Sequence, residues 1–298
     1  MKRLILLMLT CAIFITASAQ NDSTTNRKNN DTLRVGNILI IKKGAKNKTD
    51  SSWDGKKSTT IIMGRKNADR QNSRVTTNWF ILDLGFSNYD DQTNYANSGN
   101  YLVNKPGSPV FSKNDFKLRT GKSINVNFWF FMQRLNLIKR NVSLKYGLGL
   151  ELNNYRYKSS ISYQENGTVP YSGGMQTTGA FIFRDSIGFS KNKLAADYLT
   201  VPLMLTFATN HADNKKGFSI SAGISGGYLY SQRNKQKSDS RGKERNKGEY
   251  DLEKFKFSYI GELGIGPVKL YGSYSPKSMY EHSLDIRPYT FGFRFSNL

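Results

Sequence analysis

Three neighbouring residues near the C-terminus, His282, Ser283 and Asp285, carry a general base, a hydroxyl nucleophile and a carboxylate. Such a group could perform nucleophilic catalysis, for example on the acyl esters of a lipid. Side chains so close together on an extended chain diverge, however, and a polar loop tip accounts for them equally well. The other histidine, His211, is expected at the opposite end of the molecule, so the two cannot share a metal. We therefore expect neither enzymatic activity nor a bound metal or cofactor.

A second catalytic pattern, Gly-x-Ser-x-Gly, spans residues 223–227 and centres on Ser225. A nucleophile elbow of this kind needs a sharp turn from a strand into a helix, which exposes the serine. Residues 223–227 instead lie within an alternating strand pattern that no helical pattern follows. Ser225 is therefore expected to be a small side chain inside a strand, with glycines beside it that relieve crowding or allow bending.

Charged side chains provide two further candidate sites. The first set falls on one face of the expected strands and comprises Asp83, Lys145, Glu151, Glu262, Lys269 and Arg294. Charges in a confined interior persist only when they are paired and hydrogen-bonded, so these residues are predicted to form an internal ion-pair network. The second set is a basic tract that could contact an anionic surface, namely Arg233, Lys235, Lys237, Arg241, Lys243, Arg245 and Lys247. A solvated, mobile tract is the alternative explanation of this second set.

The elements that must position these residues are β-strands. From residue 79 onward the side chains alternate with a period of two between an apolar and a polar face, as in half-buried strands. The clearest apolar face comprises Ile124, Val126, Phe128, Phe130 and Met132. The pattern predicts eight strands, over residues 79–88, 119–134, 141–157, 192–208, 217–231, 253–264, 267–275 and 285–296.

The connections between these strands alternate between longer and shorter segments. This rhythm is typical of an outer-membrane barrel with long extracellular loops, short turns and both ends in the periplasm. The sequence therefore predicts an all-β fold, in which residues 79–298 form an eight-stranded antiparallel transmembrane up-and-down β-barrel. A soluble two-sheet sandwich is the alternative, but its strands are usually shorter than these, at about five or six residues.

The first nineteen residues have the features of a signal peptide. A basic start, Lys2-Arg3, precedes an apolar run over 4–15, and Ala-Ser-Ala over 17–19 forms a small-residue cleavage site. The run is too short for a membrane-spanning helix, which takes about 20 residues. The only cysteine, Cys11, lies in this segment, so the mature chain is expected to hold no disulfide and no cysteine-bound metal.

Residues 20–78 form a basic region, rich in Asn, Lys, Arg, Ser and Thr, that is predicted to be largely flexible and periplasmic. A short apolar run over 35–41 could pair there as one strand. Residues 21–78 could contact a periplasmic protein, anionic lipid or cell-wall polymer. The net charge of +22 would suit nucleic acid binding, but an exported barrel seldom meets nucleic acid, so none is expected as a partner.

Three segments carry a resemblance to a known family. The run DYLTVPLML over 197–205 resembles a strand motif of PorT-like outer-membrane β-barrel proteins of the Bacteroidetes, and the glycine-rich run over 217–230 resembles the strand that follows it. The ending YTFGFRF over 289–295 is similar to the aromatic terminal strand by which such barrels are recognised for insertion, although the chain continues to Leu298. The resemblance covers about 79–298. It implies the fold, outer-membrane location and insertion by the barrel-assembly machinery, but no common activity.

A barrel of eight strands has an interior just wide enough for side chains to fill. An open porin channel is therefore not expected, although a rearranging ion-pair network could still gate a narrow ion path. Three functions are compatible with the sequence. The first is a structural or interaction protein that presents extracellular loops, with outer-membrane lipid and lipopolysaccharide as partners. The second is a component of a secretion or envelope-assembly apparatus, and the third is an outer-leaflet lipid-modifying enzyme.

Overall fold

The computed structural model describes residues 30–35, 38–43, 59–63, 74–138, 141–209, 217–265 and 268–296. The chain divides into two compact units, Met1–Asn72 and Ser73–Leu298, which are described separately. The predicted signal peptide with Cys11, and also His211, lie outside the described residues. Within the described ranges, no helix combines the length and apolar character needed to cross a membrane.

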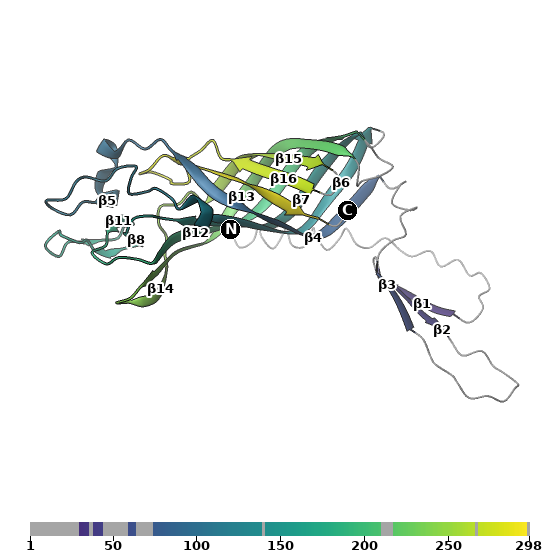
Figure 1. Ribbon diagram of the computed structural model, residues 1–298, viewed down its shortest axis with the longest axis horizontal. Helices are drawn as coiled ribbons and strands as arrows, with labels where there is room; N and C mark the ends of the chain where they lie inside the picture. The colour runs from purple at the N-terminus through teal and green to yellow at the C-terminus, as the bar shows by residue number, and fades with distance from the viewer. Residues whose placement is uncertain are drawn as a thin grey trace, which may run out of the picture. The chain divides into compact units, whose positions relative to one another are not determined.

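Eight strands of the second unit form a closed antiparallel ring (Figure 1). In ring order they are β12 (Lys191–Ala208), β7 (Val142–Arg156), β6 (Ile124–Ile138), β4 (Val75–Asp91), β17 (Ile286–Phe295), β16 (Val268–Tyr274), β15 (Phe255–Ile265) and β13 (Phe218–Ser238). Pairing between β12 and β13 completes the ring, and the first ring strand in the chain, β4, pairs with the last, β17. The predicted fold class is confirmed and the two-sheet sandwich is wrong. The barrel begins at Val75, earlier than residue 79.

Residues along the ring strands point alternately outward and inward. On β12 the exposed side chains are Leu199, Val201, Leu203, Leu205 and Phe207, whereas the residues between them are buried. The aromatic side chains exposed on the neighbouring strands include Tyr228, Tyr230, Phe255, Phe257, Tyr259, Phe291, Phe293 and Phe295. An apolar, aromatic outer face around a polar interior is the arrangement that a barrel needs in lipid.

Met132 departs from the expected outer face. The register between β6 and β7 shifts between Trp129 and Phe131 because β6 contains a bulge. A bulge inserts one residue and reverses the direction of the side chains that follow it. Met132 is therefore buried in the lumen with Ile81 and Trp129.

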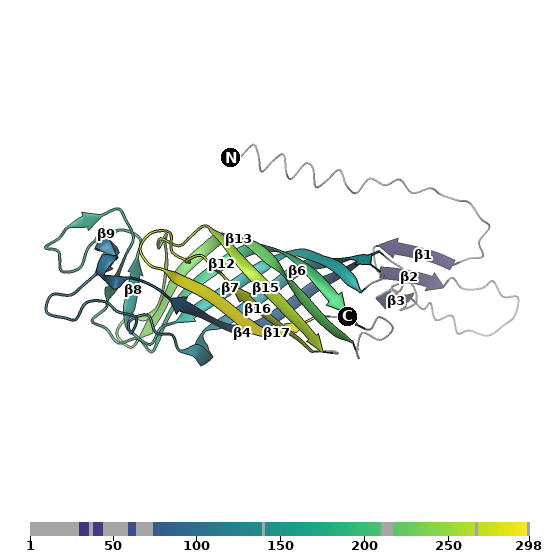
Figure 2. The same cartoon turned by 90° about the horizontal axis from the view of Figure 1, so that it is seen from above.

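The two ends of the barrel carry different connections (Figure 2). The turn end has the short connections over 139–141, 209–217 and 266–267, and the loop end has the longer ones over 92–123, 157–190, 239–254 and 275–285. The loops contain the short helices η2 (Tyr95–Asn97), η3 (Gly99–Tyr101) and η4 (Thr120–Lys122). They also contain strands β5 (Leu102–Val103), β8 (Ile161–Gln164), β9 (Gly167–Thr168), β10 (Gln176–Thr177), β11 (Phe181–Arg184) and β14 (Gly242–Lys247). We call the part formed by these four loops the cap.

The cap has a hydrophobic core of its own. Its loops supply, among others, Tyr101, Phe111, Phe116, Tyr157, Ile161, Tyr163, Ile182, Tyr250, Leu252, Met279 and Tyr280, all of which are buried. The hydroxyl of Tyr163 hydrogen-bonds to those of Tyr157 and Tyr280, at 2.6 and 2.8 Å. Arg184 makes two hydrogen bonds to Asp115, at 2.7 and 2.9 Å. The four loops thus pack together as one folded element.

The N-terminal unit contains a three-stranded antiparallel sheet in the order β1 (Asn30–Val35), β2 (Ile38–Lys43) and β3 (Thr59–Met63). The apolar run over 35–41 was expected to form one strand. In the structure Val35 ends β1 and Ile38 begins β2, so the run is divided between two paired strands.

Candidate functional sites in the lumen and the cap

The barrel interior joins four of the six predicted ion-pair residues in one network. Arg294 on β17 makes two hydrogen bonds to Asp83 on β4, at 2.7 and 2.8 Å, and one to Glu262 on β15. Lys145 on β7 donates to Glu262 at 2.7 Å. Asp83 also accepts from the indole of Trp129 at 2.7 Å. Each of the four charges therefore has an opposite charge in direct contact.

The other two predicted residues, Glu151 and Lys269, make no ion pair with these four in the described part of the chain. Glu151 pairs with Lys256, and it accepts a hydrogen bond from Asn153 at 3.0 Å. Lys269 donates to the hydroxyl of Ser296 at 3.0 Å and has no ion pair with a carboxylate of the described residues. Ion pairs among the described residues therefore join four of the six predicted residues, and hydrogen bonds through Asn153, Asn125 and Asn127 link Glu151 to Asp83. Lys256 lies an even number of residues from Glu262 on β15, so both side chains point inward. This spacing could have identified Lys256 from the sequence.

Polar side chains fill the lumen at the same level. Asn125 donates to Asn127 and to Asn153, both at 2.9 Å. A cavity of about 30 Å³ lies between side chains that include Trp129 and Arg294, which is room for about one water molecule. The interior is thus packed, as expected for a barrel of this strand number.

Ser225 lies buried within β13, where it faces Pro202 of β12 and Ser258 of β15. This position matches a small side chain inside a strand, and in the described residues after it no helix follows. At Gly223 a Cβ atom would lie 2.0 Å from the carbonyl oxygen of Leu203, so the close approach of β12 and β13 requires glycine there.

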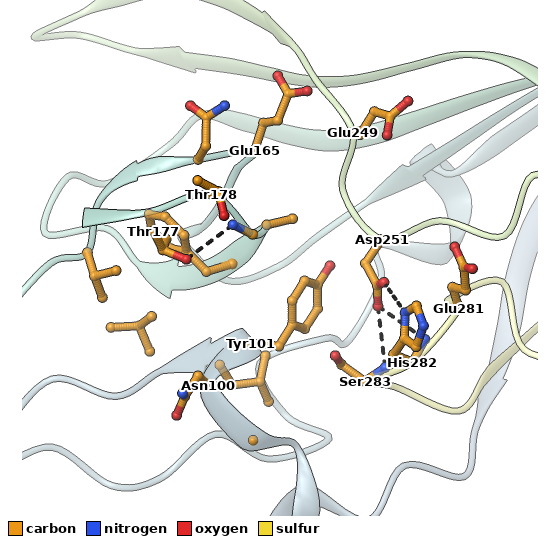
Figure 3. A pocket seen from close by; sticks show the side chains of 18 of the residues that line it. Asn100, Tyr101, Glu165, Thr177, Thr178, Glu249, Asp251, Glu281, His282 and Ser283 are labelled. Atoms are coloured by element: carbon orange, nitrogen blue, oxygen red, sulfur yellow. Dashed lines mark hydrogen bonds and ion pairs between the residues drawn. The ribbon is translucent and has the colours of Figure 1, made fainter. Parts of the chain in front are cut away.

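The cap holds a pocket of about 910 Å³ between its loops (Figure 3). Its carboxylates, Glu165, Glu249, Asp251 and Glu281, outnumber the cationic groups, which are Lys254 and, when protonated, His282. The pocket is therefore acidic, although the chain as a whole has a net charge of +22. A concave site lined by one sign of charge attracts ligands of the opposite sign.

Asp251 organises the acidic side of the pocket (Figure 3). Its carboxylate accepts a hydrogen bond from Nδ1 of His282 at 2.8 Å and from the backbone amides of His282 and Ser283, at 3.2 and 3.3 Å. The hydrogen bond and the charge of Asp251 raise the pKa of His282 above its ordinary value. Ligand atoms of Asp251, Glu281 and His282 lie within 4.8 Å of one another, a carboxylate and imidazole set that could hold a divalent cation.

The structure does not assemble the catalytic group considered from the sequence. Asp285 forms two hydrogen bonds with Arg287, at 3.0 and 2.9 Å. The carboxylate partner of His282 is instead Asp251, which comes from a different loop. Because this contact joins two loops, no local sequence pattern could have revealed it.

The predicted basic tract forms a regular hairpin. Arg233, Lys235 and Lys237 lie on β13, and Lys243, Arg245 and Lys247 lie on β14, which pairs with it. Arg241, in the turn between the strands, pairs with Asp185 at 2.8 Å and so contacts another loop.

Residues 71–278 match the family described as outer membrane protein beta-barrel domain. The match covers more than half of the chain and includes seven of the eight ring strands, from β4 to β16. No curated protein matches the sequence. The closed ring, its apolar outer face and its polar, filled lumen agree with the match, and the chain therefore belongs to the family of outer-membrane β-barrel proteins.

Proposed function

We propose that this protein is an outer-membrane binding protein, in which the barrel anchors a folded extracellular cap and the acidic pocket of the cap binds a positively charged ligand. One observation carries the proposal. The loops pack around a shared core and leave a pocket of about 910 Å³ bordered by four carboxylates. Ligand pockets are typically of this size, about 300–1,000 Å³, with a few placed polar groups.

The filled lumen supports binding over transport. Paired charges and amides occupy the interior, so a solute entering the cap pocket meets packed side chains beneath it. In the proposed orientation, the loop end is extracellular and the turn end, with both termini of the barrel, is periplasmic. A cleaved signal peptide would export the chain, and the barrel-assembly machinery would insert it.

Binding rather than catalysis is proposed because Asp285, one of the three residues considered for catalysis, pairs with Arg287 instead of His282. The His282→Ala variant tests this choice in cells. We expect the variant to insert normally and to leave the acyl composition of outer-membrane lipid unchanged. Loss of one acyl modification with normal insertion would favour a lipid-modifying enzyme.

Calorimetric titration of the purified full-length protein in detergent micelles tests the pocket, with calcium chloride and spermine as the cationic probes. The double variant Asp251→Asn, Glu281→Gln should weaken binding about tenfold or more, because charge-assisted contacts are lost. A matched control, Asp239→Asn with Glu244→Gln, removes the same charge outside the pocket and should bind like the wild type. Equal weakening in both variants, or no binding of either probe to the wild type, would contradict the proposal.

A second role, in a secretion or envelope-assembly apparatus, is favoured by the PorT-like motif over 197–205, which lies on β12. The sheet of the N-terminal unit offers a folded element for a periplasmic partner. This role predicts that a periplasmic protein co-purifies with the full chain and is lost when residues 21–72 are deleted. The double variant Asp251→Asn, Glu281→Gln, which we call the pocket variant, should leave that co-purification unchanged.

A further inference from the structure

Basic side chains stand directly opposite one another on the hairpin of β13 and β14. Three successive pairs across the hairpin are of like charge: Arg233 with Lys247, Lys235 with Arg245, and Lys237 with Lys243. Because paired residues in an antiparallel ladder point to the same face, all six side chains project from one side of the hairpin.

The neighbouring strands extend this arrangement. On β12, Lys193 faces Lys235 and Lys191 faces Lys237, and Arg156 of β7 faces Lys193 on the other side. One row thus crosses four strands and consists of Arg156, Lys193, Lys235 and Arg245. We call this the central row. One flanking row pairs Arg233 with Lys247, and the other consists of Lys191, Lys237 and Lys243. We call the three rows together the basic lattice.

The lattice is unfavourable for the protein alone. Neighbouring strands lie about 4.8 Å apart and alternate residues along a strand about 7 Å apart, so each cation has several like charges close by. Like charges directly opposite in a sheet are destabilising. Among the described residues, Asp197 is the one carboxylate ion-paired with the lattice, through Arg233, while Lys193 and Arg156 bond to the neutral oxygens of Asn154 and Ser190. Most of the positive charge must be balanced by anions from outside.

The position of the lattice identifies the source of those anions. On the outer face of β12, the exposed apolar positions from Phe207 to Leu199 are followed by the buried Asp197 and Ala195 and then by Lys193 and Lys191. On β13 the exposed ring of Tyr230 lies just before Arg233. Aromatic side chains of this kind occupy the membrane interface. The lattice therefore begins where the lipid-facing surface ends, at the level of the headgroups.

We propose that the basic lattice binds the phosphate groups of an outer-leaflet glycolipid, whose acyl chains lie against the exposed apolar side chains of β12 and β13. A phosphate oxygen accepts charge-assisted hydrogen bonds at about 2.8 Å, so one phosphate can bridge two adjacent cations of a row. The inference rests on the outer-membrane orientation proposed above, and it is independent of the cap pocket.

The test uses the purified full-length protein in detergent micelles, titrated with three probes: bisphosphorylated lipid A, dephosphorylated lipid A and inorganic pyrophosphate. The test variant, Lys193→Gln, Lys235→Gln, Arg245→Gln, neutralises three members of the central row. The control variant, Lys105→Gln, Lys122→Gln, Lys158→Gln, removes the same charge from exposed cap residues outside the lattice. At about fivefold for each lost cation, the test variant should bind bisphosphorylated lipid A about a hundredfold more weakly, and the control should bind within about twofold of the wild type.

Thermal unfolding supplies a second readout, in which the substitutions should stabilise the lipid-free protein but reduce the stabilisation that lipid A provides. In lipid-free micelles the test variant should melt higher than the wild type, because like-charge repulsion has been removed. With bisphosphorylated lipid A present, it should gain less stability than the wild type. This reversal also shows that the variant is folded.

Three results would overturn the proposal. Equal loss of lipid A binding in the test and control variants would reveal a general charge effect. Equally tight binding of dephosphorylated lipid A would mean that the lipid binds through its acyl chains alone. Pyrophosphate binding as tight as that of lipid A would make a soluble polyphosphate the ligand. The pocket variant Asp251→Asn, Glu281→Gln should bind lipid A normally, so that failure of this inference and failure of the proposed function are distinguishable.

Discussion

The lumen and the cap each have a buried interior, and the two interiors have opposite chemistry. The lumen is held by charged and amide groups such as Asp83, Arg294 and Asn125, whereas the cap is held by aromatic and aliphatic side chains such as Tyr163 and Ile182. The outer surfaces differ as well, because exposed apolar side chains cover the outside of the barrel, whereas the basic lattice lies at the base of the cap on β7, β12, β13 and β14. The comparison shows that the surroundings, lipid or water, decide which kind of side chain is buried.

The change takes place within single strands. On β7 the inward residues are Glu151 and Asn153 at the level of the lumen, and the next inward residue is Tyr155, in the aromatic core. On β12 the inward Thr200 is likewise followed by Tyr198, and the outward Leu199 gives way to Lys193. Inner and outer polarity thus invert at one level, which we take as the edge of the membrane at the loop end of the barrel.

The largest effect is expected in the lumen, from Arg294→Met. The substitution removes the cation that pairs with Asp83 and one of the two cations that pair with Glu262, and breaking a buried ion pair in this way costs about 3–5 kcal/mol. The measurement is the denaturant midpoint of the full-length protein in micelles, read by loss of heat-modifiable migration. Lys269→Met is the matched control, with a smaller expected effect because its ammonium contacts the hydroxyl of Ser296. Equal effects of both substitutions would mean that the lumen is held by packing rather than by ion pairs.

A comparable but local effect is expected in the cap, from Ile182→Ala. Ile182 is 0% exposed in the aromatic core, and such truncations cost about 2–5 kcal/mol. The cap should become sensitive to trypsin while the heat-modifiable barrel persists. Val110→Ala, at a loop position that is 71% exposed, should change neither property. If Ile182→Ala lowered barrel stability as much as Arg294→Met does, the two interiors would form one cooperative unit.

Acid should loosen the cap through Asp115. Burial raises the pKa of Asp115, but hydrogen bonds from Arg184 and Ser112 outweigh it, so the pKa lies below its ordinary value of 3.8. A lowered carboxyl pKa stabilises the fold above the ordinary value, and the contribution is lost as the pH falls through and below 3.8. The near-ultraviolet circular dichroism of the cap tyrosines should weaken in that range. In Asp115→Asn this acid step should be smaller, and an unchanged step would assign it to other groups.

The smallest effect concerns His282, whose imidazole is exposed. Asp251 raises its pKa above 6.5, so any stabilising contribution is complete below 6.5 and fades as the pH rises through the raised value. A nuclear magnetic resonance titration should show the raised pKa in the wild type and a value near 6.5 in Asp251→Asn. Asp285→Asn should leave the pKa of His282 raised, because Asp285 pairs with Arg287. A shift in Asp285→Asn alone would restore the local group considered from the sequence.

Alternation of side chains was sufficient to predict the ring and part of its interior. Strand parity placed Asp83, Lys145, Glu262 and Arg294 on the inner face, and their network follows from the closure of the barrel. The alternation predicted the wrong direction for the Met132 side chain, because the bulge in β6 reverses the direction of the side chains that follow it and leaves no trace in the composition of the strand.

The cap could not be predicted in the same way. Phe111, Phe116 and Tyr163 come from irregular loops with no period to indicate a buried face, and they meet through contacts between loops that are distant in sequence. Only part of the basic lattice could be predicted from the sequence. Its β13 and β14 residues formed an obvious basic tract, but Lys191, Lys193 and Arg156 join it through strand register, which composition does not encode.

The pairing of β4 with β17 gives Arg294 a further consequence. These strands are the first and last of the ring, and Arg294 stands directly opposite Asp83 across the joint where the ring closes. A slip of β17 by two residues would keep every side chain on its proper face, but it would set Arg294 against Ile81 or Gly85, neither of which bears a charge. Arg294 would keep its contact with Glu262, but the buried carboxylate of Asp83 would lose the cation that pairs with it. The ion pair across the joint therefore favours one shear of the closed barrel over registers shifted by two residues.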